Sequence, residues 1–249
     1  MVTRIRLLKE FSSEGKPLIV GLPGMGRVGY VSVNYFLSKN KGDLVAELYS
    51  TSFPPHLVVG KDGISSLFIG KLYDLGDFMI FTAETQPQSP DGQNEVCDSL
   101  LEFLTKRGTP RSVIAAAAYV VPEVNEKRRV YVTGNDEALL NTLTGLGGVR
   151  LNDGVIMGIN GAIVGWAQYY GIQGAVVLGE TWSAIVEFDE TDFRAAIEVI
   201  NLLGKYLGKS VDTSPLEGLM LTVEAKIQSA LDTMARMVQK EEKPRKEVL

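Results

Sequence analysis

Short apolar runs bounded by turn residues recur along this chain and alternate with helical patterns. We interpret the runs as strands because they are short, apolar and rich in β-branched residues. They cover residues 17–21, 43–50, 56–60, 64–70, 78–83, 112–121, 128–134, 154–159 and 174–180. Helical patterns lie at about 27–38, 92–106, 136–144, 161–170 and 190–208. Strands that alternate with helices predict an α/β fold, with three α/β/α layers and helices on both faces of a largely parallel sheet.

One pair of predicted strands breaks the alternation. Lys61, Asp62 and Gly63 form a turn between two neighbouring runs, without room for a helix. This arrangement predicts an antiparallel hairpin. The sheet is therefore expected to be mixed.

A long helix is predicted from Ser214, because Ser214 can cap it, Pro215 fits the first helical position and Glu217 follows three residues after the cap. Apolar residues then follow at spacings of four and three. They are Leu216, Met220, Val223, Ile227, Leu231, Met234 and Val238. We therefore expect a core domain over 1–210, a helical extension over 211–243 and a frayed, charged tail over 244–249.

The narrow apolar stripe on this helix is flanked by charges such as Glu224 and Lys226, as in a seam between two helices. A helix of about 26 residues spans roughly 39 Å, which is longer than the face of a domain of this size. Part of the helix should then overhang. We predict that the stripe binds a second subunit or a partner protein; the alternative is that it packs on its own sheet.

Composition and charge exclude several classes of protein. The chain has 249 residues, 45% of them apolar, which is enough for a packed core. It carries 25 basic and 30 acidic residues, a net charge of −5, without the basic stripe that binding to nucleic acid requires. We therefore expect no nucleic-acid partner.

The first residues, "MVTRIRLLKEFSSEGK", mix charged and apolar positions and do not resemble a secretory signal. No stretch reaches about 18 uninterrupted apolar residues, so we expect a cytoplasmic protein without a membrane anchor. Cys97 and His56 are the single cysteine and the single histidine. An intramolecular disulfide and a cysteine- or histidine-based metal site are therefore excluded, and no metal is expected.

Gly24, Gly26 and Gly29 follow the first apolar run with the G-x-G-x-x-G spacing of a dinucleotide-binding turn. Glu47 lies near the end of the next run, where such folds place a ribose-binding acid. However, Pro23 removes one of the backbone N–H groups that a pyrophosphate would bind. The structural interpretation is that glycines are needed where a strand reverses into a closely packed helix.

A second stretch, "GINGAIVGW", repeats this design with Gly158 and Gly161. The two turns could line one crevice at the carboxyl edge of the sheet. We predict structural roles for both glycine turns and expect no cofactor. The alternative is an enzyme of the phosphorylase or hydrolase kind that binds a nucleotide or nucleoside through them.

Candidate catalytic residues are few. A Cys–His pair of Cys97 and His56 is conceivable, but Cys97 falls at a core position of a predicted helix. Glu84 and Glu180 each close an apolar strand, where α/β enzymes place catalytic acids. Carboxylates that accept N–H bonds from their own loop would occupy the same places. The sequence therefore predicts no catalytic residues.

Five motifs occur in an order that resembles a known family. They are "GLPGMGRVGY", "SFPPHLVV", "TAETQPQSPDGQ", "GINGAIVGW" and "VVLGETW", followed by C-terminal helices. Over about residues 15–208 the chain is similar to the proteasome assembly chaperone family of the second type, in its archaeal form. The first and last motifs are the most specific.

The resemblance implies an α/β/α fold similar to nucleoside phosphorylases but without their catalytic residues. It also implies self-association and a non-enzymatic role in binding other proteins, including proteasome subunits. Members that dock on the proteasome end in a hydrophobic residue, a tyrosine and one final residue. This sequence has Glu247, Val248 and Leu249 there, so docking by that route is not expected.

Overall fold

A computed structural model describes residues 2–124 and 127–241. The strands within these residues are β1 (Thr3–Leu7), β2 (Pro17–Gly21), β3 (Asp43–Ser50), β4 (Leu57–Val59), β5 (Ser65–Leu67), β6 (Gly70–Asp74), β7 (Met79–Ala83), β8 (Ser112–Val121), β9 (Val130–Gly134), β10 (Val149–Arg150) and β11 (Gln173–Trp182). The helices are a 3-10 turn η1 (Met25–Arg27), α1 (Val28–Lys39), α2 (Pro90–Thr105), α3 (Glu137–Gly145), α4 (Ile159–Tyr169), α5 (Ser183–Glu187), α6 (Phe193–Leu207) and α7 (Ser214–Glu241).

In the described part of the chain, nine strands form one mixed sheet in the order β1-β3-β6-β7-β2-β8-β11-β9-β10. The four central strands β7, β2, β8 and β11 are parallel. Antiparallel pairing joins β1, β3, β6 and β7 on one side and β9 to β11 on the other. The α/β fold with a mixed sheet is therefore confirmed, and its parallel part is mainly the centre.

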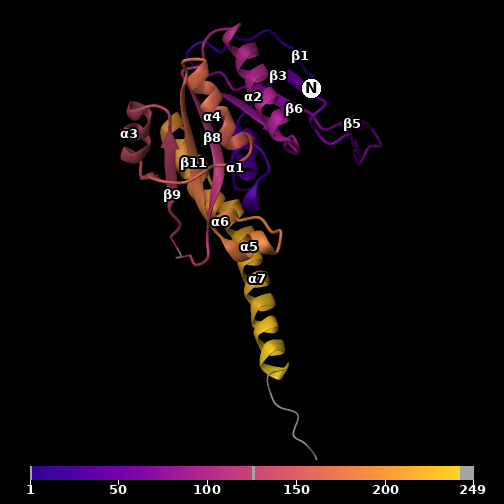
Figure 1. The fold of residues 1–249 in the computed structure, drawn as a ribbon, viewed down its shortest axis with the longest axis vertical. Coiled ribbons are helices and arrows are strands. Elements are labelled where there is room, and N and C mark those ends of the chain that lie inside the picture. Colours follow the sequence, from indigo (N-terminus) through magenta and orange to yellow (C-terminus); the bar gives the residue numbers. More distant parts are fainter. Residues whose placement is uncertain (1, 125–126, 242–249) are drawn as a thin grey trace, which may run out of the picture.

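Helices cover both faces of this sheet (Figure 1). Helices α2 and α4 pack on one face in one apolar cluster, and α1, α3 and α6 pack on the other face in a second cluster. Alternation within the strands explains the division, since Leu18 and Val20 of β2 enter the first cluster and Ile19 enters the second. The central strand β2 is buried along its whole length.

The predicted strand over 154–159 is wrong. These residues form an irregular segment that leads into α4, and Val155 and Met157 are 90% and 82% exposed. Gly154 and Gly158 have φ angles of +147° and +82°, which do not fit regular strand geometry. Val155 and Met157 therefore remain at the surface, whereas Ile159, the first residue of α4, is fully buried.

The run over 64–70 also divides in the structure. Strand β5 ends at Leu67, and β6 begins at Gly70 in the main sheet. The predicted hairpin is present, because β4 pairs antiparallel with β5 across the turn at Lys61 to Gly63. Its two strands form a separate sheet and do not extend the main one.

The long C-terminal helix is present as α7, although its first turn differs from the prediction. The helix begins at Ser214 itself, and both the backbone N–H and the hydroxyl of Ser214 donate to Oδ1 of Asp212, at 3.0 and 2.7 Å. Asp212 thus holds the start of the helix. The predicted tail over 244–249, with Glu247, Val248 and Leu249, lies outside the described residues.

Candidate partner-binding site

The first half of α7 packs against its own chain. Leu216 is 5% exposed and joins the apolar cluster beneath α6. Ile227 is fully buried in a third cluster with Ala184 and Ile185 of α5. Met220, Val223 and Leu231 are half-buried along the same side. These stripe residues are therefore largely covered within one molecule.

The second half of α7 extends away from the body of the protein (Figure 1). From Asp232 to Met237 every residue is exposed, and Met234 and Met237 are 52% and 61% exposed. Val238 lies in the helix, but its side chain is outside the described part of the structure. The overhang expected from the length of the helix is thus present, with methionines on it.

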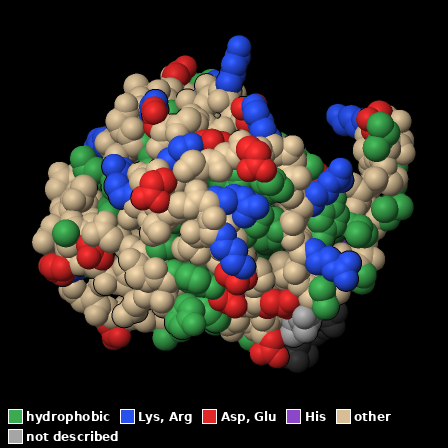
Figure 2. Space-filling view, turned by 90° about the horizontal axis from the view of Figure 1, so that it is seen from above, with side chains coloured by type: hydrophobic (Ala, Val, Ile, Leu, Met, Phe, Trp, Pro, Cys, Tyr) green, Lys and Arg blue, Asp and Glu red, His purple; other side chains and the backbone are tan. Residues whose placement is uncertain are grey.

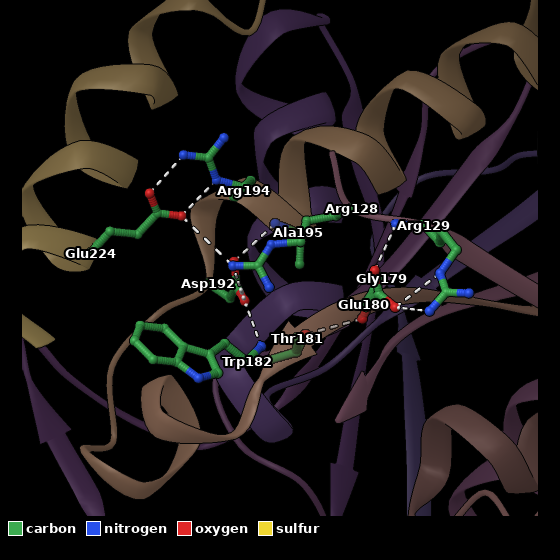
Figure 3. A network of polar contacts seen from close by, with 10 residues as sticks. All are labelled: Arg128, Arg129, Gly179, Glu180, Thr181, Trp182, Asp192, Arg194, Ala195 and Glu224. Atoms are coloured by element: carbon green, nitrogen blue, oxygen red, sulfur yellow. Dashed lines mark hydrogen bonds and ion pairs between the residues drawn. The ribbon is translucent and has the colours of Figure 1, made fainter. Parts of the chain in front are cut away.

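Ion pairs fix the angle at which α7 leaves the body (Figure 3). Glu224 of α7 accepts two hydrogen bonds of 2.6 Å from the guanidinium of Arg194 on α6. The guanidinium of Arg128, just before β9, lies 3.7 Å from the same carboxylate. Lys226 pairs with Glu190 in the loop between α5 and α6. Together with Ile227, these contacts anchor the helix in its first half.

Asp192 connects this anchor to the centre of the fold (Figure 3). Its side chain is fully buried and accepts N–H bonds from Ala195 at the start of α6 and from Trp182 at the end of β11. The Arg128 guanidinium lies 4.0 Å away. Burial raises the pKa of Asp192 and outweighs the two N–H bonds and Arg128, each of which lowers that pKa. Burial also lowers the pKa of Arg128.

The backbone N–H of Asp192 donates to the carbonyl of Gly26, so the glycine turn belongs to the same junction. Gly26 has a φ of +56°, and a Cβ there would lie 2.9 Å from Cγ2 of Thr181. A Cβ on Gly29 would lie 2.0 Å from the carbonyl oxygen of Ala116. Both glycines thus allow close approach between the turn, α1 and the sheet, which supports the structural role proposed for them.

The second turn has similar constraints. Gly158 has positive φ, and a Cβ on Gly161 would lie 2.5 Å from the carbonyl oxygen of Ile156. Gly24 differs, because the nearest atom to its Cβ position is 3.7 Å away. Gly24, Gly29 and Gly158 line one cavity of about 480 Å³ above the ends of β2 and β8. The crevice predicted between the two turns is therefore present.

The described lining of this crevice offers few ionisable or charged side chains. Among its described lining residues Tyr119 is the one ionisable group, and the rest are glycines, apolar side chains and the amides of Gln86 and Asn160. Asn160 bonds both backbone groups of Leu22, and Gln86 accepts from the N–H of Ile159. The amides thus hold the two turns together, and no charge is placed to neutralise a phosphate.

The candidate catalytic groups lie apart from one another. Cys97 is fully buried and its thiol pKa is raised by burial, whereas His56 is exposed beside Phe68. Glu84 is half-exposed, 3.8 Å from Lys71. No three described His, Cys, Asp or Glu side chains gather as a metal site. No helix in the described ranges is long and apolar enough to cross a membrane.

Glu180 is the acid that comes nearest to a catalytic placement, because it is 2% exposed at the end of a central strand. It accepts hydrogen bonds from Nε and Nη2 of Arg129 at 3.0 and 2.6 Å and from the Arg129 N–H at 3.2 Å. Burial raises its pKa, but these bonds outweigh burial and the pKa is lowered overall. Glu180 is therefore an ionised partner of Arg129, which directly precedes the neighbouring strand β9.

Comparison with known proteins decides the family. Residues 18–231 match the sequence model of the PAC2 family. The chain belongs to the PAC2 family. A relative from Methanocaldococcus jannaschii, MJ1210, is 26% identical over 178 residues, which cover 70% of this chain and 69% of that protein. The family resemblance seen in the sequence is thus confirmed.

Solved structures agree with this assignment. PbaB of Pyrococcus furiosus, described as an archaeal proteasome activator, has a TM-score of 0.82 at 26% identity, covering 92% of this PAC2 chain and 98% of PbaB. PbaA of the same organism, described as an archaeal homolog of proteasome-assembly chaperone, has a TM-score of 0.77 at 26% identity, covering 96% of each chain. Both share the α/β fold described above.

Sequence reasoning missed the polar junction of Arg128, Asp192 and Arg194. One signal was available, since an Asp directly before the pattern "FRAAIEVI" is a typical helix cap. No periodicity could show that Arg128 and Glu224, almost a hundred positions apart, would meet. That contact depends on the tertiary fold.

Proposed function

We propose that this PAC2 protein is a non-enzymatic, oligomeric chaperone or adaptor that binds partner proteins through the distal half of α7. The observation that carries the proposal is a helix anchored by buried groups in its first half and exposed in its second half. An anchored base holds the exposed turns at a defined angle, which lowers the entropy lost on binding. Exposed methionines give a surface that adapts to different partners.

The stripe residues proposed as partner-binding divide into two groups. Met234, together with Val238 by its position in the sequence, belongs to the distal contact surface. Leu216 and Ile227 support the helix from below, since they are buried within the chain. Met220, Val223 and Leu231 are half-buried and lie between the two groups.

The crevice supports a role without catalysis. General acid–base chemistry needs a titratable group within hydrogen-bond reach of the reacting atom. The described lining offers the phenol of Tyr119, and the acid at the neighbouring strand end, Glu180, is committed to Arg129. Packing also accounts for the close approaches of Gly26 and Gly29 without any bound nucleotide.

Proteasome subunits are the partners we propose, on the basis of the names of the relatives. PbaB is described as a proteasome activator and PbaA as a homolog of an assembly chaperone. We infer that this chain binds proteins of the same system, in the cytoplasm and as a homo-oligomer. The terminal residues 247–249 lie outside the described residues, and the expectation that they do not dock on the proteasome stays a prediction.

Affinity capture from native lysate, with identification by mass spectrometry, tests the proposal. The variant Met234→Asp/Met237→Asp should lose proteasome subunits that the unaltered chain retains. The matched control, Thr233→Asp/Ala235→Asp, adds the same charge in the same helical turns without removing a methionine and should retain them. Equal capture by both variants would refute a role for the distal helix.

A further inference from the structure

A groove with aromatic and acidic walls lies between α2 and α4, which pack against each other on one face of the sheet (Figure 1). Its volume is about 680 Å³, within the range of sites that hold a drug-sized molecule. The end of α4 contributes Trp166, Tyr169 and Tyr170, and α2 contributes Asp98 and Glu102. None of the described lining residues is basic. The groove therefore combines aromatic rings with negative charge.

The three aromatic rings stand at steep angles to one another. The ring centroids of Trp166 and Tyr169 lie 5.7 Å apart with an interplanar angle of 75°, and those of Tyr169 and Tyr170 lie 5.1 Å apart at 89°. The indole N–H of Trp166 donates to Oδ1 of Asn94 at 2.9 Å, which fixes this ring against α2. Tyr169 is 76% exposed. An exposed ring with fixed neighbours is a surface that binds cations.

The charge of Asp98 in this groove is not compensated. Its Oδ1 accepts a hydrogen bond of 2.6 Å from the hydroxyl of Tyr170, which is a neutral donor, and no described Lys or Arg forms an ion pair with it. Glu102 pairs with Lys106, but both side chains are more than half exposed, so this pair contributes little. Burial, together with Asp98 and Glu102, raises the pKa of Tyr170. The groove thus attracts positive charge.

Basic residues of this chain lie over aromatic rings elsewhere. The guanidinium of Arg107 lies 3.8 Å from the ring centroid of Phe103, and that of Arg111 lies 5.8 Å from the ring centroid of Tyr206. In the described ranges no Lys or Arg lies over the three rings of the groove. Their cation-binding surface is therefore available to another molecule.

The exposed apolar hairpin of β4 and β5 lacks this combination. Seen from above, it stands apart at the right of the molecule (Figure 2). Leu57, Val59 and Leu67 are exposed on it, but neither strand carries a charged residue. An uncharged apolar surface does not select one kind of partner, whereas aromatic rings beside unpaired acid select a cation.

We propose that the groove between α2 and α4 binds an arginine-bearing segment of a partner protein. The guanidinium stacks on the ring of Tyr169 and pairs with the carboxylate of Asp98. Arginine suits both contacts, because its flat guanidinium stacks on rings and matches a carboxylate, whereas lysine is a compact point charge. The groove is larger than one side chain, so residues beside the arginine lie along it.

This surface is separate from the distal half of α7. Helix α7 packs on α6 and α5, and α6 covers the face of the sheet opposite α2 and α4. The inference therefore goes beyond the proposed function and adds a second contact surface.

The two tryptophans of the chain allow a direct test. Trp166 lines the groove, and Trp182 lies at the base of α7. In the full chain labelled with ¹⁵N-tryptophan, the peptide acetyl-Gly-Gly-Arg-Gly-Gly-amide should shift the indole resonance of Trp166 saturably and leave that of Trp182 in place. The same peptide with citrulline instead of arginine keeps the shape without the charge and should bind at least about fivefold more weakly.

Two pairs of variants separate the ring and the carboxylate from general acidity. Tyr169→Leu should raise the dissociation constant of the arginine peptide by about threefold or more, whereas Tyr169→Phe keeps the ring and should leave it unchanged. Asp98→Asn still accepts from Tyr170 but loses the charge, and should raise the constant by about fivefold or more. Glu217→Gln removes the same charge from an exposed position on α7 and should change it by less than about twofold.

Several results would overturn the proposal: no shift at Trp166, equal binding of the arginine and citrulline peptides, Tyr169→Leu equal to Tyr169→Phe, or Asp98→Asn equal to Glu217→Gln. Acetyl-arginine-amide that binds as tightly as the peptide would assign the groove to a small organic cation, and this also overturns it. The variant Met234→Asp/Met237→Asp should bind the peptide like the unaltered chain. Failure of the groove and failure of the distal helix are therefore distinguishable.

Discussion

Gly26→Ala distinguishes packing from phosphate binding at the glycine turn. Gly26 occupies the second position of the G-x-G-x-x-G spacing, where a dinucleotide fold needs glycine so that the backbone can approach a pyrophosphate. In this structure the residue has a φ of +56°, and an added Cβ would lie 2.9 Å from Thr181 and 3.3 Å from Asp192. The packing interpretation therefore predicts a loss of stability.

The size of the effect follows from two terms. An L residue in the left-handed region is destabilised by about 1–2 kcal/mol, and overpacking of a core adds about 1–3 kcal/mol. Their sum is roughly 2–5 kcal/mol, which corresponds to a fall of about 10 °C in the thermal midpoint for a chain of this size. Gly24→Ala is the matched control, because Gly24 has extended backbone and a Cβ there would make only ordinary van der Waals contacts, at 3.7 Å or more. It should leave stability unchanged or raise it by up to about 1 kcal/mol.

Differential scanning calorimetry of both variants measures this difference, and titration calorimetry with adenine and nicotinamide nucleotides measures the alternative. The packing interpretation requires that the thermal midpoint of Gly26→Ala lie well below that of Gly24→Ala. It also requires that the unaltered chain bind no nucleotide. Equal midpoints would show that the close contact to Thr181 is tolerated. Micromolar nucleotide binding that Gly26→Ala abolishes would refute the interpretation.

Three further predictions follow from burial and charge. Ile227→Ala should lower the free energy of unfolding by about 2–5 kcal/mol, whereas Met234→Ala on the same helix should change it by less than about 0.5 kcal/mol in denaturant titrations. The pKa of Glu180 is lowered in the folded protein, so its ionised carboxylate stabilises the fold at pH values above the unfolded pKa of about 4.5. This stability is lost as the pH falls through the folded pKa. The difference in thermal midpoint between the unaltered chain and Glu180→Gln should therefore disappear in acid. Cys97 is fully buried with a raised pKa, so it should react with a thiol reagent only after denaturant is added.

Most of the fold follows from local patterns, and the exceptions have local causes. The strand predictions, which rest on continuous apolar runs, do not include β1. Arg4 and Arg6 interrupt its apolar residues, although this alternation is itself the pattern of a half-buried edge strand. The apolar run around Val155 and Met157 predicts a strand, because apolar residues usually indicate burial. Two glycines of positive φ hold it at the surface instead. Such a conformation is not visible in hydrophobic periodicity.

The candidate site was less predictable than the fold. Periodicity identified the stripe on α7 but could not tell which neighbour covers it. Leu216 and Ile227 are covered by α6 and α5 of the same chain, while Met234 stays exposed. The difference depends on where the helix leaves the body. Ion pairs between residues distant in sequence, such as Arg128 and Glu224, set that point.

The polar groups at the carboxyl edge of the sheet connect the fold to the proposed function. In many α/β enzymes the carboxyl edge of the sheet carries free acids and bases. In this protein Asp192 and Glu180 at that edge are used to hold α6, β9 and, through Arg128, the base of α7. The distal half of α7 projects from the bottom of the view, away from the sheet and its helices (Figure 1). In the homo-oligomer proposed above each copy would carry one such helix, so the assembly would present several anchored helices to its partners at once and gain avidity from their number.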